Sequence, residues 1–155
     1  MSDMPNFKKD FVERTLKVLK EYDSEYEVTL LLNCLLALVS FPIELQENEI
    51  NVKAEEFEVI CVNKLRSLMN EEDYINEDEF NFFSNIRNSI AHINVRLKPE
   101  NDKNTIGSVT LWNEEWYIDG KKRKKPKITF RVNISVDKLR IFAEYVAEEY
   151  LKRFF

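Results

Sequence analysis

The only histidine of this chain lies in a segment whose residue types suit the cleavage of RNA. His92 follows Arg87 by five positions and Asn88 by four. Histidine is the side chain whose ordinary pKa lets it accept and donate protons near neutral pH. Arginine binds phosphate through paired hydrogen bonds from a fork that stays charged. A phosphate-binding group beside a proton-transfer group is enough to cleave RNA without a metal, with the 2′-hydroxyl of the substrate as nucleophile.

Helical periodicity predicts that these residues lie at the end of one amphipathic helix. Residues 77–95 read as that helix, because a capping-box pattern beginning at Asn76 precedes apolar residues at three- and four-residue spacing. The apolar residues are Phe83, Ile86, Ile90 and Ile93, with Phe80 at the edge. At about 100° per residue, the stripe is centred opposite His92, which shares a face with Asn88, while Arg87 lies on the flank. The pattern therefore predicts that His92 points to solvent or to a second surface.

On its spacing alone, an arginine near a lone histidine is more often a solvated surface pair than a site. The fuller pattern Arg87-Asn88-x-x-x-His92, at the end of an amphipathic helix in a small helical domain, resembles the signature of the HEPN family. The apolar stretch 26–36 is similar to the second helix of single-domain bacterial members. A short strand pair after the motif and a closing helix are also typical of them. The resemblance spans roughly residues 7–154.

This resemblance implies a metal-independent endoribonuclease that acts as a homodimer, with the two motifs facing each other across the interface. By the same resemblance, Arg87 would bind and polarise the scissile phosphate. His92 would move protons to or from the 2′-oxygen or the leaving 5′-oxygen, and Asn88 would hold the site by hydrogen bonding. Many family members have a small residue, often glycine, after the histidine. Here that residue is Ile93, so we expect the helix to continue past the motif.

The composition is that of a compact domain, and we expect residues 1–155 to form a single HEPN-like domain. Apolar residues make up 44% of the chain, and only two glycines and four prolines are present, which leaves little room for linkers. Cys34 and Cys61 are isolated in apolar stretches, so together with one histidine they make no conventional zinc site. We expect no metal, no cofactor and no membrane contact. With buried thiols and a polar start to the chain, we expect a cytoplasmic location.

The remaining pattern predicts a mainly α fold: an up-and-down bundle of four to five helices with a small β-hairpin insert at about 106–134. The helices are expected from Phe7 to Tyr22, with Phe11, Val18 and Leu19 inward, and at 25–40, 52–69, 77–95 and 136–153. Pro42 is expected to end the second helix, and residues 70–76 and 98–104 read as polar connectors. Ser135 is the predicted N-cap of the last helix.

A run of basic residues at 121–127 is the second candidate for function. Six of its seven residues are basic although the net charge of the chain is −5, so positive charge is concentrated at the tip of the hairpin. Lys121, Lys122, Arg123, Lys124 and Lys125 are therefore candidate RNA-binding residues. A solvated hairpin end that keeps the strand edges soluble explains the same run equally well. Trp112, Trp116 and Tyr117 suit base stacking, but for Trp112 we expect packing of the sheet against the bundle.

Asn33 interrupts an otherwise apolar helix and is a weaker candidate. A buried amide needs hydrogen-bond partners. Asn33 would either support the motif helix from behind the site or bond to a neighbouring backbone carbonyl.

Three functions fit these features. The first is a metal-independent endoribonuclease, serving as a toxin or in defence against phage. The second is a catalytically inactive RNA-binding module on the same scaffold. The third is a protein-interaction module of a toxin–antitoxin pair, with an antitoxin or regulatory protein as its partner.

Overall fold

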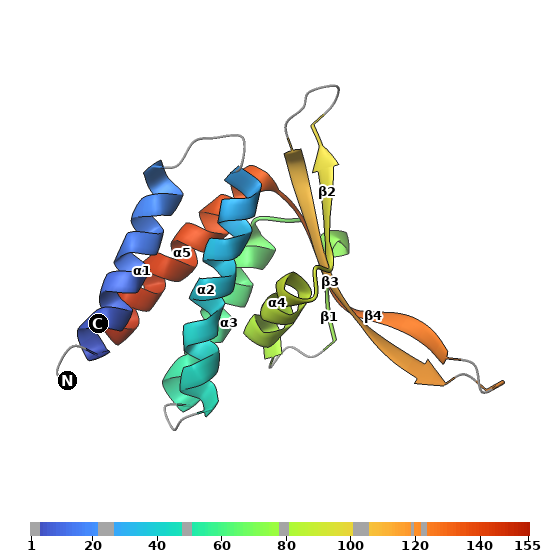
Figure 1. Cartoon of the computed structure of the whole chain (residues 1–155). Helices are drawn as coiled ribbons and strands as arrows, with labels where there is room; N and C mark the ends of the chain where they lie inside the picture. Colours follow the sequence, from blue (N-terminus) through green and yellow to red (C-terminus); the bar gives the residue numbers. More distant parts are fainter. Residues whose placement is uncertain are drawn as a thin grey trace.

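The computed structural model describes residues 4–21, 27–47, 51–77, 81–100, 106–118, 120–121 and 124–155. Side chains are not described at 4–7, 45–47, 51, 117 and 125. The described chain forms five α-helices beside one antiparallel sheet (Figure 1). The helices are α1 (Met4–Glu21), α2 (Glu27–Glu47), α3 (Asn51–Ser67), α4 (Phe82–Ala91) and α5 (Val136–Phe154). The mainly α expectation is thus confirmed.

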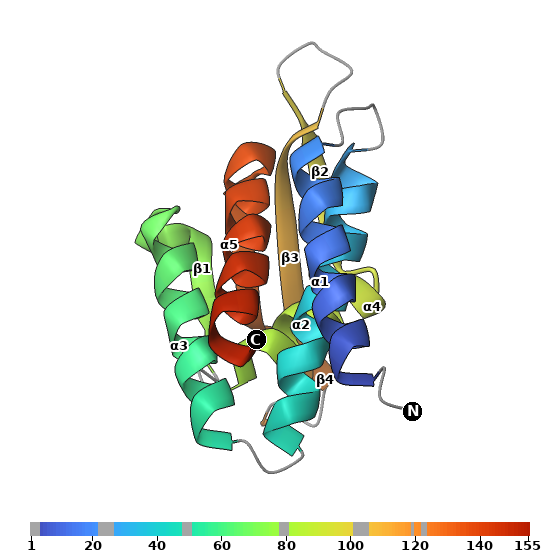
Figure 2. The ribbon, with the colours of Figure 1, turned by 90° about the vertical axis from the view of Figure 1, so that its left-hand side faces the viewer.

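Helix α5 lies at the centre of the helical layer, where it contacts α1, α2 and α3 (Figure 2). Ser135 caps its first turn by accepting a hydrogen bond from the Lys138 amide, as predicted. Aromatic rings fill the space between the helices. Phe57 of α3 lies with its ring centroid 5.9 Å from Tyr150 of α5 and 5.7 Å from Phe154. Such edge-to-face contacts add to the stabilisation that burial of the rings already provides.

The sheet is larger than the predicted hairpin. Its strands are β1 (Tyr74–Asn76), β2 (Val95–Pro99), β3 (Ile106–Ile118) and β4 (Lys124–Ser135), in the order β1-β4-β3-β2. All five α-helices lie on one side of this sheet, and the far part of the β3–β4 hairpin projects away from them (Figure 1). The buried residues of β3 and β4 face the helices: Val109, Leu111, Phe130, Val132 and Ile134.

The two added strands, β1 and β2, occupy segments for which the sequence predicts other structure. Residues 74–76 were expected in a polar connector, but they pair with 130–132 of β4. Val95 was expected in the motif helix, but it begins β2 and pairs with Leu111 of β3. Both strands are short, with three and five residues, so local periodicity does not mark them. The partner of β1 is more than 50 residues away, whereas β2 pairs with the next strand in the chain.

Pro42 does not end the second helix. α2 continues to Glu47 with Pro42 inside it. Proline removes one backbone donor and crowds the preceding turn, which costs about 3 kcal/mol in an isolated helix. In this chain Pro42 is buried, as is Ile43 beside it, so tertiary packing offsets the local cost.

The predicted inward face of α1 is confirmed at Leu19 and is wrong at Phe11 and Val18. Val12, Thr15 and Leu19 are buried, whereas Phe11 and Val18 are 37% and 39% exposed. Phe11 still makes an edge-to-face contact with Phe41 of α2, at 5.6 Å between centroids. The predicted end residues Phe7 and Tyr22 lie outside the described side chains.

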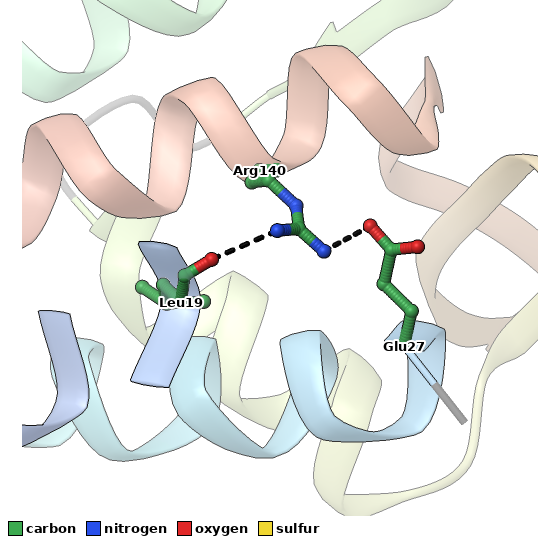
Figure 3. Close-up of polar contacts among 3 residues, drawn as sticks. All are labelled: Leu19, Glu27 and Arg140. Atoms are coloured by element: carbon green, nitrogen blue, oxygen red, sulfur yellow. Dashed lines mark hydrogen bonds and ion pairs between the residues drawn. The ribbon is translucent and has the colours of Figure 1, made fainter. Parts of the chain in front are cut away.

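One arginine joins three helices of the bundle (Figure 3). Arg140 of α5 donates a hydrogen bond of 2.8 Å from Nη1 to the Leu19 carbonyl in the last turn of α1. Its Nη2 forms an ion pair with Glu27, the first residue of α2. The guanidinium thereby satisfies a carbonyl that has no partner within α1 and fixes the ends of α1 and α2 against α5.

Residues Glu27–Glu44 of α2 are long and apolar enough to cross a membrane by length and composition alone. The same test is passed by core helices. α2 contacts α1, α3, α4 and α5, which is the position of a core helix.

Candidate active site

The motif helix α4 is anchored at its first turn by two buried phenylalanines. Phe82 lies 6.1 Å from Phe142 of α5 and 6.4 Å from Phe130 of β4, between ring centroids. Phe83 lies 5.5 Å from Phe57 of α3. The start of α4 is therefore fixed against the helical layer and the sheet at once.

A buried carboxylate supplies the cap of this helix. Asn81 occupies the N-cap position, but its side chain makes no capping hydrogen bond. Instead, the Phe83 amide donates to Glu58 Oε2 of α3 at 3.3 Å. Glu58 is only 4% exposed. A negative charge at a helix N-terminus satisfies an amide that has no partner within the helix and interacts favourably with the helix dipole. The expected cap, Asn76, lies in β1 instead.

The C-terminus of α4 corrects the expectation that the helix continues past His92. The helix ends at Ala91, and Ile93 adopts a φ of 58°. The Asn94 amide donates to the Ser89 carbonyl at 2.8 Å, and the Ile93 amide donates to the Ile90 carbonyl at 3.1 Å. These two bonds are the Schellman pattern, which normally has glycine at the left-handed position. Ile93 is 81% exposed and so does not belong to the buried stripe.

Asparagine side chains fix the flank of α4 to the sheet. The side-chain Nδ2 of Asn85 donates to Asn76 Oδ1 of β1 at 3.0 Å. The side-chain Nδ2 of Asn113, in β3, donates to the backbone carbonyl of Asn85 at 2.7 Å. Beyond the turn, the Trp112 amide donates to the Asn94 carbonyl at 3.2 Å. The motif segment is thus bound to the sheet on both sides of His92.

The three motif residues lie in the C-terminal half of α4 and at its C-cap. His92 is exposed at the C-cap, whereas Arg87 and Asn88 are half-buried. Within the part of the chain that the structure describes, the side chains of these three residues make no hydrogen bond or ion pair. Ser89 between them is fully buried and donates to the Ile86 carbonyl at 2.8 Å.

Helical geometry separates the arginine and the histidine of one chain. Five residues correspond to a rotation of about 140° around the helix axis. Asn88 and His92, four apart, share a side of the helix, as predicted from the spacing. Arg87 reaches the space beside His92 only through its long side chain.

Asn33 does not have the buried position expected of it. Its side chain is exposed on α2, although Cys34 and Leu35 beside it are buried. The polar residue interrupts the apolar run because it lies on the solvent side of the helix. The expectation that Asn33 is a buried amide is therefore wrong.

The basic run lies at the tip of the projecting hairpin. Lys121 and Lys124 are exposed, and Lys127 forms an ion pair with Glu77 at 3.0 Å. Lys122 and Arg123 lie outside the described residues, as does the side chain of Lys125. No described contact joins this tip to the motif.

The outer face of the sheet holds residues that the site prediction left out. Trp112 alternates with the buried Leu111, so it points away from the helices and does not pack the sheet against the bundle. It lines a shallow cavity of about 230 Å³ together with Arg96, Thr110, Glu114, Ile128 and Arg131. The alternation of Leu111 and Trp112 is a sequence signal for this placement.

The two cysteines are unsuited to nucleophilic chemistry. Cys34 and Cys61 are free thiols and both are buried. Burial raises the pKa of each above its ordinary value, so both thiols stay protonated at neutral pH. Among the described residues, no three His, Cys, Asp or Glu side chains gather as a metal site would require.

The helical layer and the Arg-Asn-x-x-x-His motif at the exposed end of an anchored helix fit the resemblance to HEPN domains. The family model described as HEPN pEK499 p136 matches residues 1–154. The chain therefore belongs to this HEPN family. A comparison of the chain with the curated proteins found no match, and neither did a comparison with the solved structures.

Proposed function

We propose that this chain is a metal-independent endoribonuclease whose active site is completed by a second copy. The observation that carries the proposal is the placement of the motif. His92 is exposed at a turn whose backbone is held on both sides, with Arg87 and Asn88 on the same short helix. Membership of a HEPN family, in which a nuclease or toxin-like role is common, supports it.

In the proposed reaction, the 2′-oxygen of the RNA attacks the adjacent phosphorus, and the bond from phosphorus to the 5′-oxygen breaks. One histidine accepts the proton of the 2′-hydroxyl, and a protonated histidine donates a proton to the leaving 5′-oxygen. Arg87 neutralises the charge that develops on the phosphoryl oxygens, because its guanidinium donates two hydrogen bonds at once. Asn88 orients the groups by hydrogen bonding. The products are a 2′,3′-cyclic phosphate and a 5′-hydroxyl.

Two features of the chain favour a second copy at the site. Each chain has one histidine, whereas the reaction needs a proton acceptor and a proton donor together. Ile93, next to His92, is 81% exposed, and an apolar side chain at that position gains from burial in an interface. A symmetric dimer around this turn brings two histidines and two arginines to one cleft.

The chemical nature of the product ends tests the reaction. Purified protein is incubated with a 5′-labelled single-stranded RNA in EDTA, and the products are treated with acid or with a phosphatase. We expect 3′ ends that resist phosphatase until acid opens a cyclic phosphate. Products with free 3′-hydroxyls, or cleavage that appears only with Mg²⁺, contradict the proposal.

The biological role that suits such an enzyme is a toxin or an effector of anti-phage defence, held in check by an antitoxin or regulatory protein. An unregulated ribonuclease harms its own cell, so its activity needs a partner or a trigger.

The second candidate is a catalytically inactive RNA-binding or protein-interaction module. The exposed basic residues Lys121 and Lys124 at the tip of a projecting hairpin favour it. On this alternative, RNA binding falls when these lysines are neutralised, and no RNA is cleaved under any condition.

A further inference from the structure

The face of the sheet opposite the helices contains a cavity lined by residues of the three strands that follow the motif in the chain. All five α-helices lie on the other side of the sheet (Figure 1). The cavity of about 230 Å³ opens on this outer face over β2, β3 and β4. Its lining combines two guanidinium groups, one indole and one carboxylate: Arg96, Arg131, Trp112 and Glu114.

Arg131 brings to this cavity a donor that lacks an acceptor. Its Nη2 donates to the Glu72 carbonyl at 3.1 Å, which fixes the guanidinium. Its Nε is buried and has no hydrogen-bond partner among the described residues. A buried donor of a charged group without a partner is costly, and such groups are uncommon in folded proteins. The Arg131 guanidinium is therefore only partly paired, and its positive charge favours an anionic group in the cavity that it lines.

Trp112 gives the cavity an aromatic wall. Its Nε1 donates to Glu114 Oε1 at 3.0 Å, and the Arg96 guanidinium lies 5.8 Å from the ring centroid. The orientation of the tryptophan is fixed and a guanidinium lies over one face of its ring, so the pair presents two planar groups suited to stacking with a base. Glu114 adds an acceptor of the kind that pairs with base amino groups.

The chain path places this cavity beside the motif. Arg96 follows His92 by four residues, and the segment between them is the turn at Ile93 and Asn94. The Trp112 amide donates to the Asn94 carbonyl, so the indole-bearing residue is bonded to the same turn. The turn that follows His92 is therefore joined directly to two of the strands that line the cavity.

We propose that the cavity lined by Arg96, Trp112 and Arg131 binds an unpaired nucleotide of the RNA adjacent to the cleaved bond. The phosphate pairs with the two arginines and the base stacks on Trp112. Bases in a duplex are stacked on one another, so the site selects single-stranded RNA. This inference rests on the proposed function.

Binding is measured in the His92→Ala background, by fluorescence anisotropy of a labelled single-stranded RNA. Arg96→Ala removes one exposed positive charge that lines the cavity. Lys98→Ala is the matched control, because it removes one exposed charge from the same strand outside the lining. We expect Arg96→Ala to weaken binding roughly tenfold. We expect Lys98→Ala to weaken it less than threefold. Equal losses contradict the inference.

The tryptophan offers a direct readout. Trp116→Phe leaves Trp112 as the only tryptophan of the chain. We expect single-stranded RNA to quench its fluorescence with the affinity measured by anisotropy. A mononucleotide makes the cavity contacts but lacks those of the neighbouring nucleotides with the motif, so it should quench the fluorescence only at much higher concentration. Unchanged Trp112 fluorescence on RNA binding overturns the inference, and equal quenching by the mononucleotide overturns the assignment to RNA.

Cleavage assays separate the failure of this inference from that of the proposed function. With His92 intact, Arg96→Ala should raise the KM for RNA and leave kcat within about threefold. If the wild-type chain cleaves RNA while Arg96→Ala and Lys98→Ala behave alike, only the cavity assignment is wrong. If the wild type neither binds nor cleaves RNA, the proposed function is wrong and the inference is overturned with it.

Discussion

At the scale of single residues, Ile93 determines how His92 is presented. A β-branched residue with a φ of 58° is rare, because its Cβ crowds the backbone in the left-handed region. Two hydrogen bonds, from Ile93 to Ile90 and from Asn94 to Ser89, nevertheless hold the turn. Strain of this kind is typical of functional sites, where surrounding structure maintains a required geometry. The turn ends the helix at Ala91 and leaves His92 at the surface.

Ile93→Gly should raise the free energy of unfolding by about 1 kcal/mol, because glycine relieves the strain and an exposed isoleucine contributes little burial. The measurement is urea denaturation at a concentration at which the chain is monomeric. Ile93→Val keeps the strain and should stay within about 0.5 kcal/mol of the wild type. A glycine variant less stable than the valine variant contradicts this interpretation of the turn.

At the scale of elements, α4 depends on its neighbours for stability. It has 10 residues, and a helix of that length is not stable alone in water. Phe82 and Phe83 fix its first turn, Glu58 caps it, and the Ile93 turn ends it. The site is therefore presented by tertiary contacts rather than by the intrinsic stability of the helix.

Glu58→Ala should lower the free energy of unfolding by about 2 kcal/mol, because it leaves the buried Phe83 amide without an acceptor. Glu58→Gln retains an oxygen acceptor and should lose less. Urea denaturation gives the totals, and hydrogen exchange of the α4 amides locates the effect. If the two variants lose the same amount, the carboxylate does not act as a cap for α4.

The sequence predicted the features that depend on local interactions and missed those that depend on tertiary contacts. α5 and its Ser135 cap were predictable, because periodicity and capping are local. β1 and β2 were not, because both are short, β1 pairs with residues far away in the chain, and β2 begins only where the Ile93 turn ends the motif helix. The continuation of α2 past Pro42 was not predictable either, because it depends on tertiary packing. The motif residues were found from their types and spacing, whereas Arg96 and Arg131 join Trp112 only through the register of the sheet.

At the scale of the whole molecule, the charges are unevenly distributed. The net charge is −5, yet the projecting hairpin ends in a run of basic residues. A polyanion is therefore attracted to one part of a molecule that otherwise repels it. In the proposed dimer, two motifs meet at one cleft, and the position of this cleft relative to the basic hairpins depends on how the two copies pack.

Ile93→Asp should reduce self-association and cleavage together, because it places a charge in the proposed interface. Ile141→Asp is the matched control, since Ile141 is also exposed, at 45%, but lies on α5 away from the motif turn. Sedimentation velocity and the dependence of the cleavage rate on protein concentration measure the two effects. A wild-type chain that sediments at its monomer mass of 18.5 kDa while cleaving RNA contradicts the two-chain site.

The proposed function requires that His92 and Arg87 cleave RNA without a metal. The direct measurement incubates labelled single-stranded RNA and tRNA in EDTA with four proteins of verified fold: wild type, His92→Ala, Arg87→Ala and Arg14→Ala. Arg14 is an exposed arginine of α1, so its variant controls for the loss of charge. We expect cleavage by the wild type and Arg14→Ala, and a loss of at least a hundredfold in the two motif variants. Cleavage that persists in His92→Ala, or that requires added Mg²⁺, would contradict the account.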